Sequence, residues 1–189
     1  MLKYTELIYK MFAMKKFINI ITMAIALVAI LQVTGSCSKV LSKDIAINNV
    51  KLQFDIEGTK TKAGETEDVL YEGDLDINIT AELEKQGLSA KNLKSLNLKN
   101  GRLELVSPAG FDMNVFKGMK LYFGDNDNKV IVAKANEVKN NVAYFTINAS
   151  GLKKFLNNDK IHITITGPRP IDDVRVTLIT DYVVNIGLL

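Results

Sequence analysis

The feature that most constrains the fold is the alternation of apolar and polar side chains along residues 174–188. A period of two places successive side chains on opposite faces of a β-strand. One face of this segment is apolar apart from Thr180, while Ile179 and Val183 add apolar side chains to the polar face. We predict a central strand, because a long edge strand promotes aggregation. The alternative is an edge strand that accepts a strand from another chain.

Shorter alternating segments precede this strand. Ile45 and Ile47 alternate in one phase and residues 50–56 in the other, which predicts a strand with a bulge at Asn48-Asn49. A second strand is predicted over residues 75–83. Further strands are predicted over 96–105 (with a phase change at Asn100-Gly101), 119–123, 130–132, 142–147 and 161–165.

The connecting segments carry loop, turn and helix signals. Residues 58–68 are polar and predict an exposed loop, and residues 84–93 predict one or two helical turns. Asp112 is expected to cap a turn over residues 113–117, and Ser150 to begin a short helix over 152–156. Residues 125–128 (Asp-Asn-Asp-Asn) predict a β-hairpin.

Short strands at this spacing predict an all-β fold for residues 45–189. The specific expectation is an antiparallel, immunoglobulin-like sandwich of two sheets with short connecting helices. The chain contains a single cysteine, so an intramolecular disulfide is impossible and stability must come from packing.

The N-terminal segment has the order of a secretory signal peptide. Lys15 and Lys16 precede a largely apolar run over residues 18–33, and small residues then lead to Cys37. We therefore predict that residues 1–36 are a signal peptide, with Met14 as the true start. The alternative is an uncleaved membrane-spanning helix, since the run approaches the length of ~17 to 25 residues that a span requires.

The five residues Val33-Thr34-Gly35-Ser36-Cys37 resemble the lipobox of bacterial lipoproteins. The resemblance implies that Cys37 carries a diacylglycerol and a further acyl chain such as palmitate, and becomes the first residue of the mature protein. Two or more acyl chains hold a protein firmly on a membrane. Residues 37–44 would then be a lipidated tether. Ser38 follows the cysteine where aspartate would signal inner-membrane retention, so the resemblance implies the outer membrane, on either its periplasmic or its surface side.

Charge gives no indication of a nucleic-acid partner. The chain has 24 Lys and Arg against 21 Asp and Glu, a net charge of +3. Residues 1–36 hold four of the lysines and one glutamate, which leaves 20 charges of each sign in the mature chain. A neutral domain has no net field with which to attract a polyanion.

The polar residues predict no catalytic, cofactor or metal site. His162 is the sole histidine, which excludes His-His metal pairs, and its position in an alternating segment predicts a solvent-facing strand residue. The spacing of Asp125 and Asp127 matches part of a calcium loop, but Lys129 occupies the next ligand position and a turn is expected instead. Four carboxylates, Asp74, Asp76, Asp172 and Asp173, are the candidates if the chain were a hydrolase.

In its overall pattern the chain resembles the small all-β lipoproteins of Bacteroidetes-type bacteria, and more distantly the sandwich domains of the second type of late embryogenesis abundant proteins. We expect a non-enzymatic outer-membrane lipoprotein that acts as a binding or structural module of the cell envelope. Its partners would be the membrane, through Cys37, and an envelope protein or glycan. The alternatives are an envelope hydrolase that uses Asp or Glu carboxylates, and a subunit of a surface fibre or adhesin.

Overall fold

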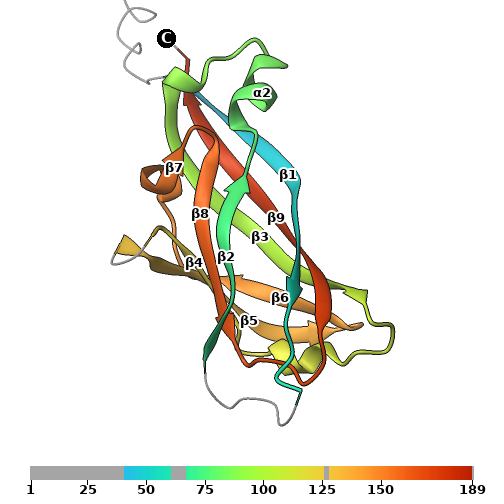
Figure 1. The fold of residues 1–189 in the computed structure, drawn as a ribbon. Coiled ribbons are helices and arrows are strands. Elements are labelled where there is room, and N and C mark those ends of the chain that lie inside the picture. Colours follow the sequence, from blue (N-terminus) through green and yellow to red (C-terminus); the bar gives the residue numbers. More distant parts are fainter. Residues whose placement is uncertain (1–40, 61–66, 126–127, 189) are drawn as a thin grey trace, which may run out of the picture. The chain divides into compact units, whose positions relative to one another are not determined.

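One antiparallel sheet of nine strands dominates the computed structural model, which describes residues 41–60, 67–125 and 128–188 (Figure 1). The strands are β1 (Ser42–Ile56), β2 (Asp68–Asp76), β3 (Leu93–Ser107), β4 (Lys120–Phe123), β5 (Val130–Lys139), β6 (Val142–Ile147), β7 (Leu156–Asn157), β8 (Lys160–Gly167) and β9 (Val174–Gly187). The helices are short: α2 (Ile79–Glu84), η1 (Ala90–Asn92), η2 (Met113–Phe116) and η4 (Leu152–Phe155).

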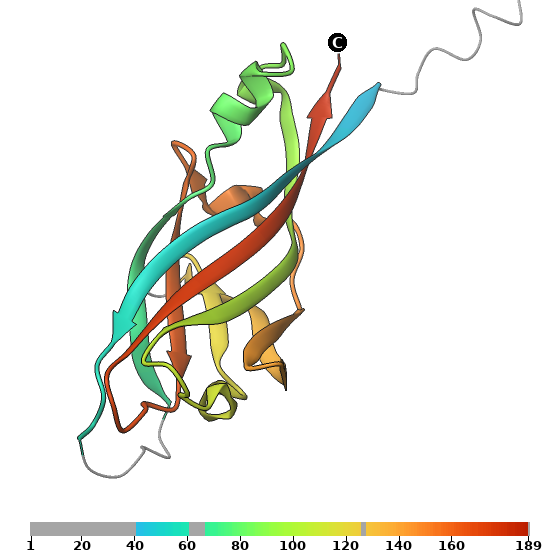
Figure 2. The same cartoon turned by 90° about the vertical axis from the view of Figure 1, so that its right-hand side faces the viewer.

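The hydrogen-bonded order is β1-β9-β3-β6-β5-β4-β8-β2, with β7 paired to β8. The sheet curls, so that its edge strands β1 and β2 approach each other (Figure 2). The all-β, antiparallel prediction is confirmed. The two-sheet, immunoglobulin-like sandwich is not, because the ladders join the strands of the described chain into a single curled sheet.

The alternating C-terminal segment forms β9, and its predicted central position is confirmed. β9 pairs with β1 on one side and with β3 on the other. Tyr182 is 0% exposed and Thr180 is 1% exposed, as expected for the core-facing side. Ile179 points to the opposite face but is only 3% exposed. The register places it between Lys51 and Arg102, whose long side chains share its face.

Both predicted phase changes are β-bulges. The register of β1 against β9 shifts between Ile47 and Val50, and Asn49 adopts a left-handed φ of 58°. The main-chain N–H of Asn49 donates to the carboxylate of Asp181 at 2.8 Å. In β3 the register shifts again between Leu98 and Asn100. Each bulge moves the following apolar residues back onto the core face.

The predicted strand over residues 75–83 is wrong in its second half. β2 ends at Asp76, because the Asp76 carboxylate accepts the N–H of Asn78 at 2.9 Å and Asn78 adopts a left-handed φ of 55°. Helix α2 follows, and its Ile79 and Leu83 are 0% exposed. These two residues are four apart, so they satisfy the period of a helix as well as that of a strand. The Asp159 carboxylate accepts the Thr80 N–H at 3.2 Å, at the start of α2.

The other connectors follow the predictions with one exception. Asp112 caps η2 by accepting the N–H of Asn114 at 2.9 Å, and β4 and β5 form the predicted hairpin. Ser150 does not begin η4, because the residue at its N-terminus is Gly151 with a φ of 69°. Asn97 accepts the Gly151 N–H there at 2.9 Å.

Within the described residues, the structure contains no helix long and apolar enough to cross a membrane. The predicted signal peptide, Cys37 and the first half of the predicted tether, residues 1–40, lie outside those residues. The loop predicted over 58–68 is described at its two ends only, and Asp127 also lies outside the described chain.

Candidate functional site: a polar hollow on β2 and β8

The outer face of β8 and β2 carries a hollow of about 920 Å³. Its floor is the polar side of β8, where Lys160 and His162 alternate with the fully buried Ile161 and Ile163. β2 forms one wall. The other wall consists of Gly124, Asp125 and Asn128, which follow β4, and of residues 154–158 from η4, β7 and the turn after it. The framework is therefore a hydrogen-bonded sheet that holds its side chains in fixed positions.

Two carboxylates converge on the imidazole of His162. Asp74 lies directly across the β2–β8 ladder from His162, and its Oδ1 is 3.0 Å from Nδ1. Glu72 lies two residues earlier on the same face of β2, and its Oε1 is 3.3 Å from Nε2. The side chains of Glu72, Asp74 and His162 are 53%, 58% and 32% exposed.

This arrangement favours the charged imidazolium. The hydrogen bond to Asp74 is the main cause that raises the pKa of His162 above its ordinary value; burial opposes it, and the hydrogen bond to Glu72 adds a smaller upward effect. An imidazole bonds to a carboxylate at each nitrogen only when both nitrogens carry a proton. The geometry is thus that of a protonated His162 held between two carboxylates.

The opposite wall is held close to β8 by Gly124. Its N–H donates to the main-chain carbonyl of His162 at 3.0 Å, and its φ is +100°. A Cβ at this position would lie 2.9 Å from the carbonyl oxygen of Asn128 and 3.0 Å from the Phe155 ring. Only glycine fits here. Phe155 is half-buried, and the ammonium of Lys154 lies 4.8 Å from its ring centroid.

The hollow is lined mainly by polar and charged groups. His162 has no free nitrogen lone pair while both nitrogens donate, so it cannot act as a general base in this state. Among the residues that the structure describes, no group of three His, Cys, Asp or Glu side chains is arranged to hold a metal ion. The walls instead offer amides, carboxylates and ammonium groups to a polar ligand.

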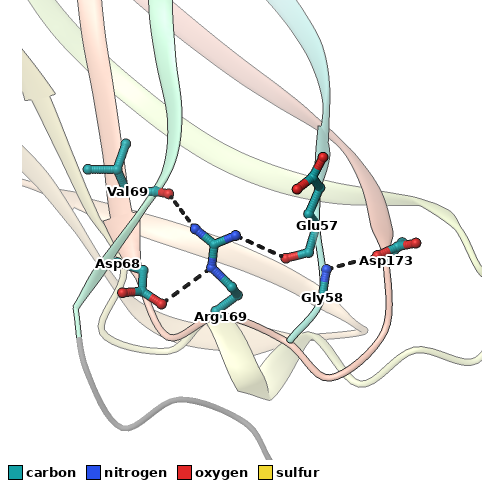
Figure 3. Close-up of polar contacts among 6 residues, drawn as sticks. All are labelled: Glu57, Gly58, Asp68, Val69, Arg169 and Asp173. Carbon is teal, nitrogen blue, oxygen red and sulfur yellow. Dashed lines mark hydrogen bonds and ion pairs between the residues drawn. The ribbon is translucent and has the colours of Figure 1, made fainter. Parts of the chain in front are cut away.

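The four carboxylates considered for a hydrolase are not brought together. Asp74 lies in the hollow, and Asp76 is engaged with the N–H of Asn78. Asp173 lies just before β9, where its carboxylate accepts the N–H of Gly58 at 2.9 Å (Figure 3). Asp172 is its exposed neighbour. β2 pairs with β8 in a register that separates Asp74 from this end by most of the strand.

His162 is not the plain solvent-facing residue that its position predicts. It does lie on the outer face of β8, but it is the centre of the charged cluster. The sequence does contain one indication of this cluster. Glu72 and Asp74 are two residues apart, a spacing that places both side chains on one face of a strand. What the sequence could not provide was the pairing of β2 with β8, across a separation of 88 residues.

A second polar cluster joins the two edges of the sheet. Arg169, in the loop between β8 and β9, donates to the main-chain carbonyl of Glu57 at 3.4 Å and to that of Val69 at 3.1 Å (Figure 3). Its Nε donates to Asp68 at 3.3 Å. One guanidinium thus connects the end of β1 with the start of β2, which is a structural role.

Comparison with known proteins assigns no function. No protein-family model and no curated protein matches the chain. Two solved structures of the BFDV capsid protein are similar to it at 10% identity. The decameric form has a TM-score of 0.40 and covers 78% of this chain and 100% of its own. The 60-mer has a TM-score of 0.35 and covers 79% of this chain and 95% of its own. Similarity this low carries no argument about this chain.

Proposed function

We propose that this protein is a lipid-anchored, non-enzymatic binding module of the bacterial outer membrane, and that its binding site is the hollow on β2 and β8. The lipobox-like sequence ending at Cys37 supports the anchor. The observation that carries the binding role is the Glu72–His162–Asp74 cluster, because it presents fixed polar groups in a hollow while its histidine is occupied.

Two alternatives rest on weaker support. An envelope hydrolase needs two carboxylates that face each other across a cleft, and of its four candidate residues only Asp74 lines the hollow. A fibre subunit could form by adding a strand to an exposed edge. The long C-terminal strand is not available for this exchange, because β1 and β3 flank β9.

Replacement of Cys37 tests the anchor. The wild-type protein and the Cys37→Ser variant would be expressed in a bacterium that has an outer membrane. Each would then be partitioned between the detergent and aqueous phases of a phase-separating detergent. We expect the wild type in the detergent phase with its leader removed, and the variant outside it. A variant that stays in the detergent phase with its leader attached would instead indicate a transmembrane anchor.

Protease treatment of intact cells tests the side of the membrane. We propose the periplasmic side, because Ser38-Lys39-Val40-Leu41-Ser42-Lys43 contains no acidic residue of the kind that surface-exported lipoproteins of this group usually carry. Protection of the domain until the outer membrane is permeabilised is the expected result. Digestion in intact cells would place the domain outside and favour an adhesive role.

A further inference from the structure

We propose that the hollow binds a neutral glycan, and that the glycan binds when the cluster of Glu72, His162 and Asp74 holds its proton. This inference rests on the proposed binding function and names the ligand class of the same site. It concerns the hollow alone and does not depend on which side of the membrane the domain occupies.

The charges of the hollow exclude strongly charged ligands. Its acidic side chains are Glu72 and Asp74 from β2 and Asp125 from the turn after β4. Its basic side chains are Lys154 from η4 and Lys160 and His162 from β8. With His162 protonated, the part of the lining that the structure describes carries three charges of each sign. A polyanion would meet carboxylates and a polycation would meet other cations, and like charges brought together weaken binding.

The polar groups of the hollow suit hydroxyl-rich molecules. A hydroxyl both donates and accepts, and an asparagine amide does the same through its two ends. Asn128, Asn157 and Asn158 provide such amides around the rim. A carboxylate offers about four lone-pair positions, and each of the carboxylates on β2 uses one on His162. Their exposure leaves the others within reach of a ligand.

Phe155 provides the apolar surface that a sugar ring also needs. The ring is half-buried against Gly124, which fixes its position, and Lys154 lies over it on a flexible stem. Aromatic rings contribute large contact areas at low entropic cost. A glycan has both polar edges and apolar ring faces, and the hollow matches both with amides on its rim and an aromatic ring in its wall.

The proton on His162 keeps this arrangement together. In the neutral imidazole one nitrogen is an acceptor and would face a carboxylate that is also an acceptor. Glu72 or Asp74 would then move away, and the hollow would carry one net negative charge. The hydrogen bonds to Asp74 and Glu72 raise the pKa of His162 and so favour its protonated form. Glycan binding should therefore weaken when the pH rises above that pKa.

Calorimetry on the full lipidated protein in detergent micelles tests the inference. The probes are maltohexaose, mannohexaose and chitohexaose, each at about pH 6 and at about pH 9, which lie below and above the ordinary histidine pKa of about 6.5. We expect at least one of them to bind at the lower pH and to bind about tenfold or more weakly at the higher pH. Because this is the only histidine of the chain, its NMR resonance reports its pKa directly. If the glycan binds tenfold more weakly to the deprotonated protein, saturation with the glycan should raise the pKa of His162 by about one unit.

Variants separate the hollow from the rest of the surface. Asn157→Ala and His162→Gln should each weaken the binding, and His162→Gln should also abolish its pH dependence. Arg102→Gln, on the distant strand β3, should leave both unchanged. If His162→Gln fails to fold, Asn157→Ala and the NMR titration still decide.

Three results would overturn the inference. They are no binding of any probe at either pH, binding that neither hollow variant weakens, and tighter binding of a heparin oligosaccharide or of polylysine than of the neutral probes. The Cys37→Ser partitioning experiment tests the anchor independently. If the glycan experiments fail, the proposal of a lipid-anchored binding module is unaffected and only the proposed ligand class is lost.

Discussion

Phe54 on β1 and Tyr71 on β2 bring their ring centroids within 4.6 Å, although their strands stand at opposite ends of the hydrogen-bonded order of the sheet. Side-chain packing therefore holds the two edges of the curled sheet together at this point. Phe54 is only 7% exposed.

Phe54→Ala should accordingly cost about 3 to 5 kcal/mol of unfolding free energy, since it removes a large buried ring and leaves a cavity. Urea denaturation followed by circular dichroism measures the cost. Ile131→Ala is a suitable control, because Ile131 is 42% exposed and its truncation should change stability by less than about 0.5 kcal/mol. An equal loss of unfolding free energy in the two variants would contradict packing of β1 against β2 at Phe54.

Arg169→Ala should weaken the contact between the two edge strands at the end of β1 and the start of β2. The variant removes the shared donor of the carbonyls of Glu57 and Val69. The cost should be about 0.5 to 1.5 kcal/mol, because both bonds are exposed and water can replace the donor. Hydrogen exchange should quicken around residues 57–60 and 68–70. Arg102→Ala is the matched control, because both arginine side chains are 31% exposed and pair with a carboxylate. Unchanged hydrogen exchange in these two segments would show that Arg169 is not needed to hold β1 and β2 together.

Tyr182→Phe should stabilise the protein or leave it unchanged. Tyr182 is 0% exposed, and its hydroxyl is a buried side-chain oxygen of the described chain without a hydrogen-bond partner. Burial raises its pKa. An unsatisfied buried hydroxyl costs about 1 to 3 kcal/mol, and phenylalanine removes the hydroxyl while keeping the ring. A clear loss of thermal stability in the variant would mean that the hydroxyl makes a stabilising contact.

Glu67 should contribute stability that is lost in acid. Its carboxylate accepts from Lys120, Thr166 and Tyr122, and the bond from Lys120 contributes most to lowering its pKa to about 2. A lowered pKa stabilises the folded state above the unfolded value near 4.5, and this contribution disappears as the pH falls through about 2.

Glu67→Gln should therefore be less stable at neutral pH by about 1 kcal/mol, a value reduced for solvent screening of a half-exposed pair. The difference from wild type should shrink as the pH falls. Glu104→Gln removes a carboxylate of similar exposure that pairs with Arg102 and should cost less. A constant difference between Glu67→Gln and wild type from pH 7 to pH 2 would be inconsistent with this mechanism.

The alternation of side chains was enough to predict most strands, both bulges and the central place of β9. Alternation encodes which face is buried, and a phase change encodes a bulge, so both are local properties of the sequence. It failed at Ile79 and Leu83, because residues four apart share a face in a strand and nearly so in a helix. The strand end was decided instead by the Asp76 side chain and the left-handed Asn78.

The candidate site was less predictable than the fold. Asp74 and His162 were each placed on the outer face of a strand, but nothing local indicates that β2 pairs with β8 in the register that joins them. The same holds for Arg169, whose partners on β1 and β2 lie about a hundred residues earlier, at separations of 112 and 100. Both clusters depend on pairing between strands that are far apart in the sequence. An alternating pattern predicts which face of a strand a residue lies on, but not which residue of another strand lies beside it.

The intact mass of the protein extracted from membranes tests the proposed lipid anchor at Cys37. We expect the mass of residues 37–189 plus a diacylglycerol and a further acyl chain, with both lipids on the N-terminal cysteine. A mass that includes residues 14–36 and no lipid would contradict it.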